Sequence, residues 1–332
     1  MASPFFNAIK GTTSGTPGTG AFTPNAAYAG YIAWSTVPTG WIGLVRYEDG
    51  TAWELTYSYW DGSTLSRAST QMVTSSSGSQ LSLTSAALAG MVIDPAEVMP
   101  HLGGAQMRGC WALPNSTTTP TVIGLAAMTI TGTATASGAL ATTNFLTEQV
   151  RHRTDSATTA NAQAGISMTT PIAITSTSAG HGGWEYVVRF GSSQLVTGQR
   201  LFTGMTATTF VANTGEPSAL TASCAVFAKD STDTNIQLLV NSNAGSGTKT
   251  DTGIPLTANG WYEASLWSNP GSNTVNALLV RLDTGAIWYG TTSTDVPANG
   301  ALLFPQHLGG LAATTGTAFR METSSIIIRC GT

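Results

Sequence analysis

The segment from residue 46 to residue 67, RYEDGTAWELTYSYWDGSTLSR, restricts the fold more than any other part of the chain. Between its two Asp-Gly pairs, successive side chains alternate between two faces, as they do along a β-strand. One face carries Trp53, Leu55, Tyr57 and Tyr59, and the other carries Glu54, Thr56, Ser58 and Trp60. Asp-Gly between alternating runs is the strongest short-range signal for a hairpin. Together with residues 41–47 and 63–73, the segment therefore predicts a three-stranded antiparallel meander.

The carboxylates of this segment are better explained as turn residues than as catalysts. Asp49–Gly50 and Asp61–Gly62 are predicted to form two-residue type I′ turns, in which glycine supplies the positive φ angle. The two aspartates then lie at opposite ends of a strand, roughly 35 Å apart. Paired glycosidase carboxylates lie under about 10 Å apart. Glu48 and Glu54 remain as a cross-strand pair for a hydrolase, but no motif supports that reading.

Composition favours β-structure with a surface of hydroxyl groups. Only 9% of the 332 residues are charged, where about a quarter is typical of globular domains. Serine and threonine make up roughly a quarter of the chain, and there are 37 glycines. Threonine favours strands and glycine favours turns. A low charge content is also typical of surfaces that are buried in an assembly.

Several classes of function are disfavoured by the same composition. The net charge is −4, and no basic run is longer than residues 151–153, so we expect no nucleic-acid partner. Cys110, Cys224 and Cys330 are too few and too scattered for a disulfide framework and are expected to be buried thiols. We see no signal peptide and no run of about twenty apolar residues. The expectation is a chain made in the cytoplasm, without a membrane span.

The order of alternating runs and turn residues along the chain predicts an all-β protein with four regions. Residues 1–29 read as an extended N-terminal arm, and 30–110 as a small antiparallel β-sandwich or barrel that serves for attachment. Residues 111–166 read as a linker and docking loop, and 167–332 as a C-terminal β-sandwich or jelly roll. The strands expected in the last region are 182–193, 199–205, 222–228, 235–241, 260–268, 274–282, 286–293 and 318–330.

The sequence lacks the usual motifs of catalytic, metal-binding and phosphate-binding sites. The four histidines, at 101, 152, 181 and 307, have no metal-ligand spacing, and His181 reads as a loop residue. KDSTDTN (229–235) loosely resembles a calcium loop but lacks its glycine and distal glutamate, so a hairpin tip is expected. There is no phosphate-binding loop and no nucleophile elbow. We therefore predict no catalytic residue, no metal and no cofactor.

Aromatic side chains near the C-terminal end are the candidate ligand-binding residues. They are Trp261, Tyr262, Trp267, Trp288 and Tyr289. Exposed aromatic rings stack on sugars, and neighbours such as Glu263 and Asn269 can bind sugar hydroxyls. The alternative is that these rings fill the core, because positions 261 and 262 face opposite sides of a strand.

Two stretches resemble a known family. GAFTPNAAYAGYIAW followed by GWIGLVRYEDGTAWELTYSYWDGSTLSR is similar to a segment of tailed-bacteriophage virion proteins, in which an EDG…WE strand precedes a G-x-T-L-x-R strand. The second half is similar to a phage tail-protein module. Its motifs are GQRLFTGMTAT, EPSAL, DTNIQLLVN, YEASLWSNPGSNTV, RLDTGA, STDVPANGALLFPQ and SSIIIR. The two matches cover about residues 20–73 and 165–330.

The resemblance implies a non-enzymatic structural component of a phage particle. The expected form is a tail-fibre or adaptor protein that displays its C-terminal sandwich, resides in the virion and assembles as a homotrimer. Its expected partners are other tail or capsid proteins, with a host-surface glycan as an additional candidate. A capsid decoration protein or head fibre is the alternative, and a polysaccharide hydrolase is a third one. The family brings no catalytic residue to carry over. The chain also lacks long shaft repeats, which favours a compact part over a long fibre.

Overall fold

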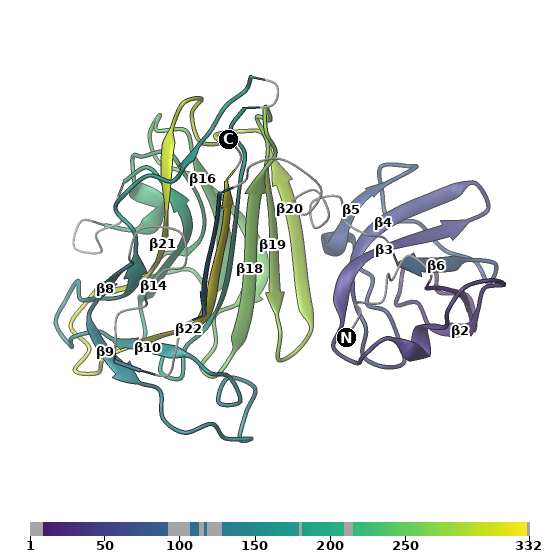
Figure 1. Ribbon diagram of the computed structural model, residues 1–332, viewed down its shortest axis with the longest axis horizontal. Coiled ribbons are helices and arrows are strands. Elements are labelled where there is room, and N and C mark those ends of the chain that lie inside the picture. The colour runs from purple at the N-terminus through teal and green to yellow at the C-terminus, as the bar shows by residue number, and fades with distance from the viewer. Residues whose placement is uncertain are drawn as a thin grey trace. The chain divides into compact units, whose positions relative to one another are not determined.

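The structure is a computed structural model that describes residues 9–91, 107–112, 116–117, 128–178, 181–208 and 215–330. These residues divide into two compact units. The first contains the chain up to residue 103 together with 287–290, and the second contains 104–286 and 291–332. Figure 1 traces both units, and each is described by itself. The described residues are almost entirely strands and turns, which confirms the all-β prediction.

The first unit is built on one antiparallel sheet in the order β2-β1-β6-β3-β4-β5. Its strands are β1 (Lys10–Thr13), β2 (Pro24–Ala27), β3 (Ile42–Asp49), β4 (Ala52–Tyr59), β5 (Met72–Ser75) and β6 (Leu88–Met91). Consecutive pairing of β3, β4 and β5 confirms the meander, although its third strand begins at Met72, later than predicted. Phe22 and Trp60 each form an antiparallel bridge to Leu65. These bridges connect the chain before β2 to the end of β4, so the sheet curls into a small barrel.

The core of this barrel collects aromatic side chains from residues far apart in the sequence. Phe22, Trp34, Tyr47, Trp60 and Leu65 are all buried in one cluster. Trp34 sits in a short 3-10 helix, Trp34–Thr36. Its indole N–H donates to the carbonyl of Ala89 at 2.9 Å. The aromatic ring thus fixes a non-strand segment against the sheet by packing and by a hydrogen bond.

The prediction of an extended arm over residues 1–29 is wrong for the part that the structure describes. Strands β1 and β2 belong to the sheet, and Lys10 pairs with Gly90 of β6. The Thr- and Gly-rich sequence hides these strands because neither has an apolar alternation. Backbone pairing and the bridge of Phe22 to Leu65 hold these strands in the sheet, although their side chains show no strand pattern. Residues 1–8 lie outside the described residues.

The first Asp-Gly turn is displaced by one residue from the predicted one. Asp49 pairs with Ala52, so the two turn residues are Gly50 and Thr51. Gly50 has a φ of +63° and Thr51 is not left-handed, which is the pattern of a type II′ turn and corrects the predicted type I′. Asp49 is therefore the first residue of the turn and not a central one, and its carboxylate accepts hydrogen bonds from the backbone N–H of Thr84 at 2.6 Å and the Thr84 hydroxyl at 2.9 Å.

The second Asp-Gly pair does form a turn, between Trp60 and Leu65. Gly62 has a φ of +97°, and a Cβ placed on it would lie 2.8 Å from the Thr39 hydroxyl. One carboxylate oxygen of Asp61 accepts the backbone N–H groups of Ser63 and Thr64 at 2.7 and 2.6 Å. Burial alone would raise the pKa of Asp61, but hydrogen bonds from Thr64 and Ser63 outweigh it and lower the pKa to about 2. The pair lies in a turn, as predicted, but four residues separate Trp60 from its partner Leu65 and Asp61 has no positive φ, so the predicted two-residue type I′ turn is wrong here too.

The second unit is a sandwich of two antiparallel sheets (Figure 1). One sheet has the order β20-β19-β18-β13-β22-β10-β9, and β7 also pairs with β22. Its strands are β7 (Met107–Ala112), β9 (Thr133–Ala136), β10 (His152–Asp155), β13 (Trp184–Gly191), β18 (Trp261–Ser268), β19 (Val275–Arg281), β20 (Ala286–Thr292) and β22 (Arg320–Cys330).

The other sheet has the order β17-β16-β15-β14-β21-β11-β8, and β12 also pairs with β21. Its strands are β8 (Thr129–Thr131), β11 (Gln163–Ser167), β12 (Ala173–Ile174), β14 (Gln199–Thr206), β15 (Cys224–Lys229), β16 (Asn235–Asn241), β17 (Thr248–Pro255) and β21 (Leu302–Leu311). All eight strands predicted between 182 and 330 are present in the two sheets. β21, with 10 residues, and β22, with 11, are the longest strands, and each has strands paired on both sides within its own sheet.

The two sheets also share a buried hydrogen-bond network. The hydroxyl of Tyr186 on β13 lies 2.8 Å from that of Thr203 on β14, which lies 2.9 Å from Nδ1 of His307 on β21. The His307 ring packs against Phe190, with ring centroids 5.1 Å apart. Burial lowers the pKa of His307 to about 3, so the imidazole is neutral in the folded state. This network fixes the two layers at one register.

The linker predicted over 111–166 is wrong, because strands β8 to β11 fall within it and belong to the sandwich. Residues 121–127 lie outside the described residues. β21 was also missed: Pro305 lies in its middle, and proline in a run argues against a central strand. The edge strand β17 was missed because it is polar and largely exposed.

Two smaller expectations have a direct outcome. Cys224 and Cys330 are free and buried, as predicted, and burial raises the pKa of each thiol to about 12. The side chain of Cys110 lies outside the described residues. Among the described residues, no helix is both long enough and apolar enough to cross a membrane.

The two turn glycines generate one prediction. Gly50→Val and Gly62→Val should each lower the free energy of unfolding by about 1 kcal/mol or more, because a β-branched residue is strained at positive φ. Gly62→Val should cost more, since its side chain also meets Thr39, whereas a Cβ on Gly50 meets nothing within 4 Å. Asp61→Asn keeps an acceptor oxygen and serves as the control. Thermal unfolding of the three variants measures the order, and equal losses at both glycines would contradict it.

The inter-sheet network generates a second prediction, on pH. The unfolded state takes up a proton on His307 below its ordinary pKa of 6.5, while the folded state does not until about pH 3. Stability is therefore fully present above pH 6.5 and falls as the pH drops toward 3, by about 1.4 kcal/mol per pH unit. His307→Asn keeps a polar group near Thr203 but cannot titrate. Urea unfolding between about pH 6 and pH 5 should show a shallower dependence for this variant than for the natural chain, and identical slopes would refute the assignment.

Candidate functional site

Glu54, the central carboxylate of the acidic stretch, is fully buried, and both of its oxygens are fully hydrogen-bonded. Its oxygens accept Nε and Nη2 of Arg67, each at 2.8 Å. They also accept the Thr56 hydroxyl at 2.6 Å and the backbone N–H of Leu81 at 2.8 Å. Neither side chain of the ion pair is exposed to solvent. A carboxylate in this state has no free lone pair or access path for a substrate, so Glu54 is a structural residue.

Arg67 also makes hydrogen bonds outside this ion pair. Its guanidinium donates to the carbonyls of Gly18 and Leu81 as well as to Glu54. It also lies over the ring of Tyr47, 5.4 Å from the centroid, and the Tyr47 hydroxyl lies 2.7 Å from that of Ser58. The polar face of β4 therefore points into the barrel, and the apolar face is partly exposed. Usual amphipathic alternation would place these faces the other way round.

Glu48 is also held in ion pairs. It lies 2.6 Å from Nζ of Lys10 and 3.1 Å from Nε of Arg46, at a partly exposed site. Lys10 in turn lies over the rings of Tyr28 and Tyr31. Glu48 and Glu54 thus have separate partners, and the structure does not assemble them as an acid–base pair.

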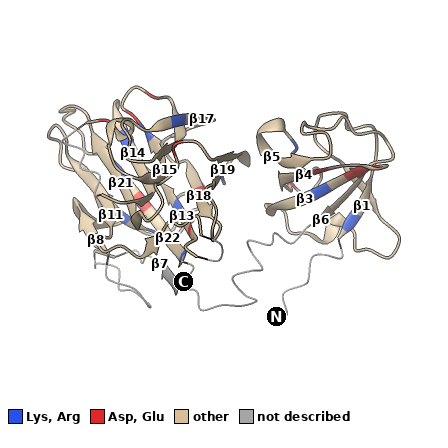
Figure 2. Cartoon of the chain, turned by 90° about the horizontal axis from the view of Figure 1, so that it is seen from above, with Lys and Arg blue, Asp and Glu red and all other residues tan. Residues whose placement is uncertain are grey.

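The second unit contains a similar buried pair. Arg151 Nε lies 3.2 Å from Oε1 of Glu322, and both side chains are almost completely buried. Oε2 of Glu322 accepts the backbone N–H of Ser193 at 2.6 Å. In Figure 2 charged residues are sparse against the uncharged background of the chain. The buried pairs show that part of this small number of charges serves the interior.

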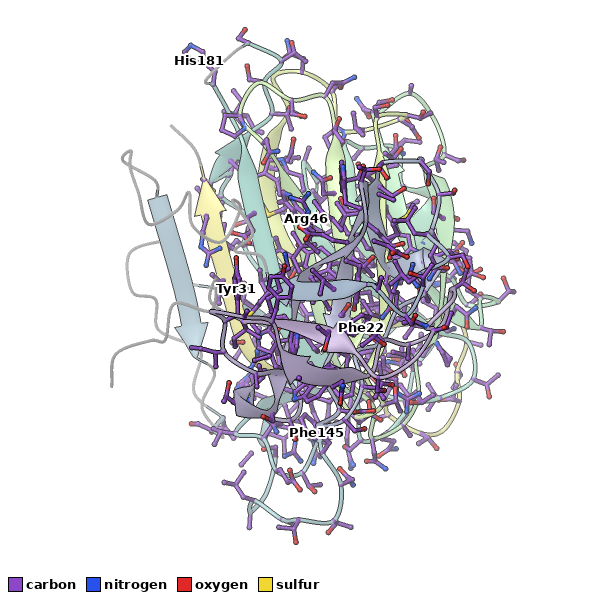
Figure 3. All side chains as sticks on the ribbon, turned by 90° about the vertical axis from the view of Figure 1, so that its right-hand side faces the viewer. Phe22, Tyr31, Arg46, Phe145 and His181 are labelled. Carbon is purple, nitrogen blue, oxygen red and sulfur yellow. The ribbon has the colours of Figure 1, made fainter. Side chains whose placement is uncertain are left out.

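The calcium-like loop is a hairpin tip, as predicted. Asp230 and Asp233 both accept from Nζ of Lys249, at 2.8 and 2.9 Å, and Asp230 also accepts the Ser218 hydroxyl. The carboxylates of this tip are thus paired with a lysine ammonium. No group of three or more His, Cys, Asp or Glu side chains among the described residues is arranged to hold a metal. His181 lies in an exposed loop (Figure 3), as expected.

The structure places the five predicted aromatic residues in different environments. Trp261 and Tyr262 are fully buried, so their prediction as exposed sugar-binding residues is wrong. Tyr262 stacks on Phe190 and its hydroxyl bonds to the backbone of residues 255 and 257. Trp261 faces the other side of β18, where the space above Gly191 is shared with buried Leu146.

Of the other three aromatic residues, Trp288 is buried, while Trp267 and Tyr289 are half-buried. Their role in binding stays a prediction.

A small pocket, here called the Trp184 pocket, lies where four chain segments meet in the second unit. Residues 175–177 follow β12, Trp184 begins β13, residues 268–275 connect β18 to β19, and residues 296–299 precede β21. Together with the open solvent at its mouth, the pocket spans about 290 Å³. None of its lining residues is charged. They are Thr175, Ser176, Thr177, Trp184, Ser268, Ser272, Asn273, Thr274, Val275, Val296, Pro297 and Asn299.

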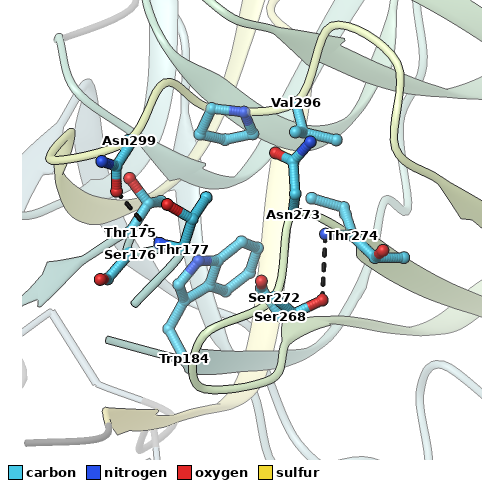
Figure 4. Close-up of a pocket in the computed structure, with 12 residues that line it drawn as sticks. Thr175, Ser176, Thr177, Trp184, Ser268, Ser272, Asn273, Thr274, Val296 and Asn299 are labelled. Atoms are coloured by element: carbon cyan, nitrogen blue, oxygen red, sulfur yellow. Dashed lines mark hydrogen bonds between the residues drawn. The ribbon is translucent and has the colours of Figure 1, made fainter. Parts of the chain in front are cut away.

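Hydrogen bonds hold the lining in place, one between two of its segments and one within the segment 268–275 (Figure 4). Thr177 donates its backbone N–H to the side-chain oxygen of Asn299 at 3.1 Å, and Thr274 donates its own to the Ser272 hydroxyl at 3.1 Å. Trp184 is 3% exposed, and its indole N–H has no hydrogen-bond partner among the described residues. The Trp184 pocket thus combines a fixed frame with one unused, buried donor.

Sequence reasoning did not single out Trp184 as a binding residue. It appeared only as the first aromatic residue of an alternating strand. One signal in the sequence was that Trp184 follows the Gly182–Gly183 pair. Such a pair indicates that another segment packs closely against the backbone, and a Cβ on Gly183 would indeed lie 2.8 Å from Pro270. The other lining residues are serines, threonines and asparagines in loops, which are too common in this chain to stand out.

The environment of Glu54 gives a prediction that separates a structural carboxylate from a catalytic one. Glu54→Gln leaves the buried Arg67 charge without its partner and should lower the free energy of unfolding by about 3–5 kcal/mol. Glu48→Gln, at a partly exposed pair, should cost less than about 1 kcal/mol. Urea unfolding measures both. The double variant Glu54→Met with Arg67→Met should recover much of the loss, because no charge stays buried. A stable Glu54→Gln protein would contradict the structural role.

Comparisons with known proteins concern the fold alone. No protein-family model and no curated protein matches the sequence. A protein of unknown function from Shewanella oneidensis MR-1 is 15% identical with a TM-score of 0.46, over 72% of this chain and 95% of its own. A seed lectin of Lotus tetragonolobus is 10% identical with a TM-score of 0.44, over 67% and 96%. Basic winged bean lectin is 11% identical with a TM-score of 0.45, over 68% and 98%. Similarity at this level says nothing about ligands, so the site described above rests on its own geometry.

Proposed function

We propose that this chain is a non-catalytic structural protein of a bacteriophage particle, of the tail-fibre or adaptor type. In this proposal the first unit serves for attachment to other virion proteins, and the C-terminal sandwich is displayed and contacts glycans on the host surface. The proposal is supported by the phage-like motifs over about residues 20–73 and 165–330 and by the low charge of the whole chain. Assembly as a homotrimer is part of it.

One observation carries the non-catalytic part: almost all carboxylates of the described residues are engaged in holding the fold. Glycoside hydrolysis needs a carboxyl whose pKa is raised, so that it can act as an acid, near a second carboxylate. The pKa shifts of carboxyl groups among the described residues are in the opposite direction, because each pKa is lowered. Burial alone would raise the pKa of Glu216, but hydrogen bonds from Arg200 and Ser231 lower it to about 2. Asp155, Asp251 and Asp295 also have lowered pKa values. Carboxyls tuned in this direction stay ionised and serve as acceptors.

The glycan-binding part is supported by the polar, uncharged character of the Trp184 pocket. Its hydroxyl and amide groups match the hydrogen-bonding groups of sugars, and its loops are held together before any ligand arrives. A capsid decoration protein or head fibre is the second candidate, because the same low charge and β-rich units fit a part that covers a capsid. The hydrolase candidate has only the acidic stretch in its favour, and Glu54 there is closed to substrate.

The proposal predicts that the chain is found in the finished particle. Antibodies raised against the recombinant chain should detect it in purified phage particles of its host, and cryo-electron microscopy should place it at the tail. Density on the capsid shell instead would favour the decoration alternative. Sedimentation of the purified chain at micromolar concentration should give a trimer. A monomer that is missing from purified particles would refute the structural proposal.

A further inference from the structure

We propose that the Trp184 pocket binds one hydroxyl group of an uncharged saccharide. The indole N–H of Trp184 donates to the sugar oxygen, and the Asn273 amide holds the sugar at the mouth. This inference deepens the proposed function and rests on its glycan-binding part. It adds which residues make the contact and which chemical class of sugar they accept.

The first argument is the unused donor. Buried indole N–H groups normally find a hydrogen-bond partner, because leaving one unpaired is unfavourable. Trp184 is 97% removed from solvent, yet its N–H has no partner among the described residues. Figure 4 shows its nitrogen-bearing edge turned toward the wall formed by residues 175–177. Trp261 also has an unpartnered N–H, but it does not line this pocket. A ligand oxygen would supply the acceptor that Trp184 lacks.

The second argument comes from the mouth of the pocket. Asn273 is exposed, and its side chain makes no hydrogen bond to a described residue. In Figure 4 Asn273 and Asn299 lie on opposite sides of the opening, with the Trp184 indole between and below them. Asn299 uses one lone pair of its oxygen to accept from Thr177, whereas the whole side-chain amide of Asn273 is available to a ligand. A side-chain amide both donates and accepts, which suits a sugar hydroxyl.

The third argument is charge and size. Every lining residue is neutral, so the pocket offers nothing to compensate a carboxylate, phosphate or ammonium group that leaves water. Its enclosed part is the size of about one water molecule or one hydroxyl group. A whole sugar ring therefore cannot enter. The geometry admits one hydroxyl or hydroxymethyl group, while the rest of the saccharide lies against the mouth.

The fourth argument is that the site is already formed. Besides the Thr177–Asn299 bond, Gly300 donates its N–H to the carbonyl of Thr175 at 2.9 Å, and Gly271 donates to that of His181 at 2.8 Å. Each bond ties two different lining segments or their neighbours together. A frame fixed in this way loses little conformational freedom when a ligand binds, which favours even a single-hydroxyl contact.

The test follows the indole N–H of Trp184 directly. The full-length chain is labelled with ¹⁵N-tryptophan, and the Trp184 resonance is identified by its loss in Trp184→Phe. Glucose, galactose, mannose and N-acetylglucosamine are titrated up to about 50 mM, a range that covers millimolar affinities. Glucuronic acid is the charged comparison. Trp53→Phe, in the other unit, is the matched control for loss of a tryptophan.

The expected result is a saturable shift of the Trp184 resonance with at least one neutral sugar and none with glucuronic acid. Asn273→Ala, followed on the Trp184 resonance, and Trp184→Phe, in which binding is measured by isothermal titration calorimetry, should each weaken binding about tenfold, the effect of one lost hydrogen bond, while Trp53→Phe changes nothing. Binding that leaves the Trp184 resonance unmoved, or that Trp184→Phe leaves intact, would place the sugar elsewhere and overturn this site. Exchange of the N–H with water and no response to any sugar would make the pocket a hydration site only.

The same variants separate this inference from the proposed function. Trp184→Phe particles should contain the chain in normal amount, because the pocket is not part of an attachment surface. Failure of the natural chain to appear in particles would refute the virion role while leaving sugar binding open to the titration. Binding of host glycans by the natural chain with no effect of Trp184→Phe would keep the proposed function and remove the site.

Discussion

The ion pair between Glu54 and Arg67 is the interaction on which the first unit depends. It lets β4 turn its polar side chains inward, because the guanidinium neutralises Glu54 and the remaining acceptors are met by Thr56 and Leu81. Without that compensation, burying this face would leave a charge in the barrel at a large cost. Arg67 also holds the carbonyls of Gly18 and Leu81, so one side chain connects the N-terminal segment, β4 and the segment before β6.

The sandwich of the second unit uses polar groups in the same way. Arg151 and Glu322 form a buried pair, and Tyr186, Thr203 and His307 form a chain of hydrogen bonds between the sheets. Apolar packing is non-directional and tolerates many arrangements, whereas such bonds have defined lengths and angles. In a chain with so few charges, placing several of them inside leaves a surface of hydroxyls and amides. That surface suits contact with neutral partners, whether protein subunits or sugars.

The packing of the two sheets also forms the Trp184 pocket. Strand ends from both sheets bring their loops to one place, and hydrogen bonds among the loops keep the opening in a fixed shape. Its only aromatic donor lies at the start of β13, a strand whose other aromatic residues fill the core. A rigid sandwich thereby presents a small neutral site without any metal or catalytic group in its lining.

The sequence by itself determined the all-β class, the eight alternating strands between 182 and 330, the turn at Asp61–Gly62 and the burial of Cys224 and Cys330. These follow from alternation and turn chemistry, which act over a few residues. Only the tertiary structure decided that β4 is buried on its polar face, that Pro305 lies in a central strand, and that residues 10–13 and 24–27 pair into the barrel. It also decided that Trp261 and Tyr262 are core residues while Trp184 lines a pocket. The reason is that burial of a polar group or an aromatic ring depends on partners tens of residues away, as Arg67 is for Glu54, and no local pattern encodes such a partner.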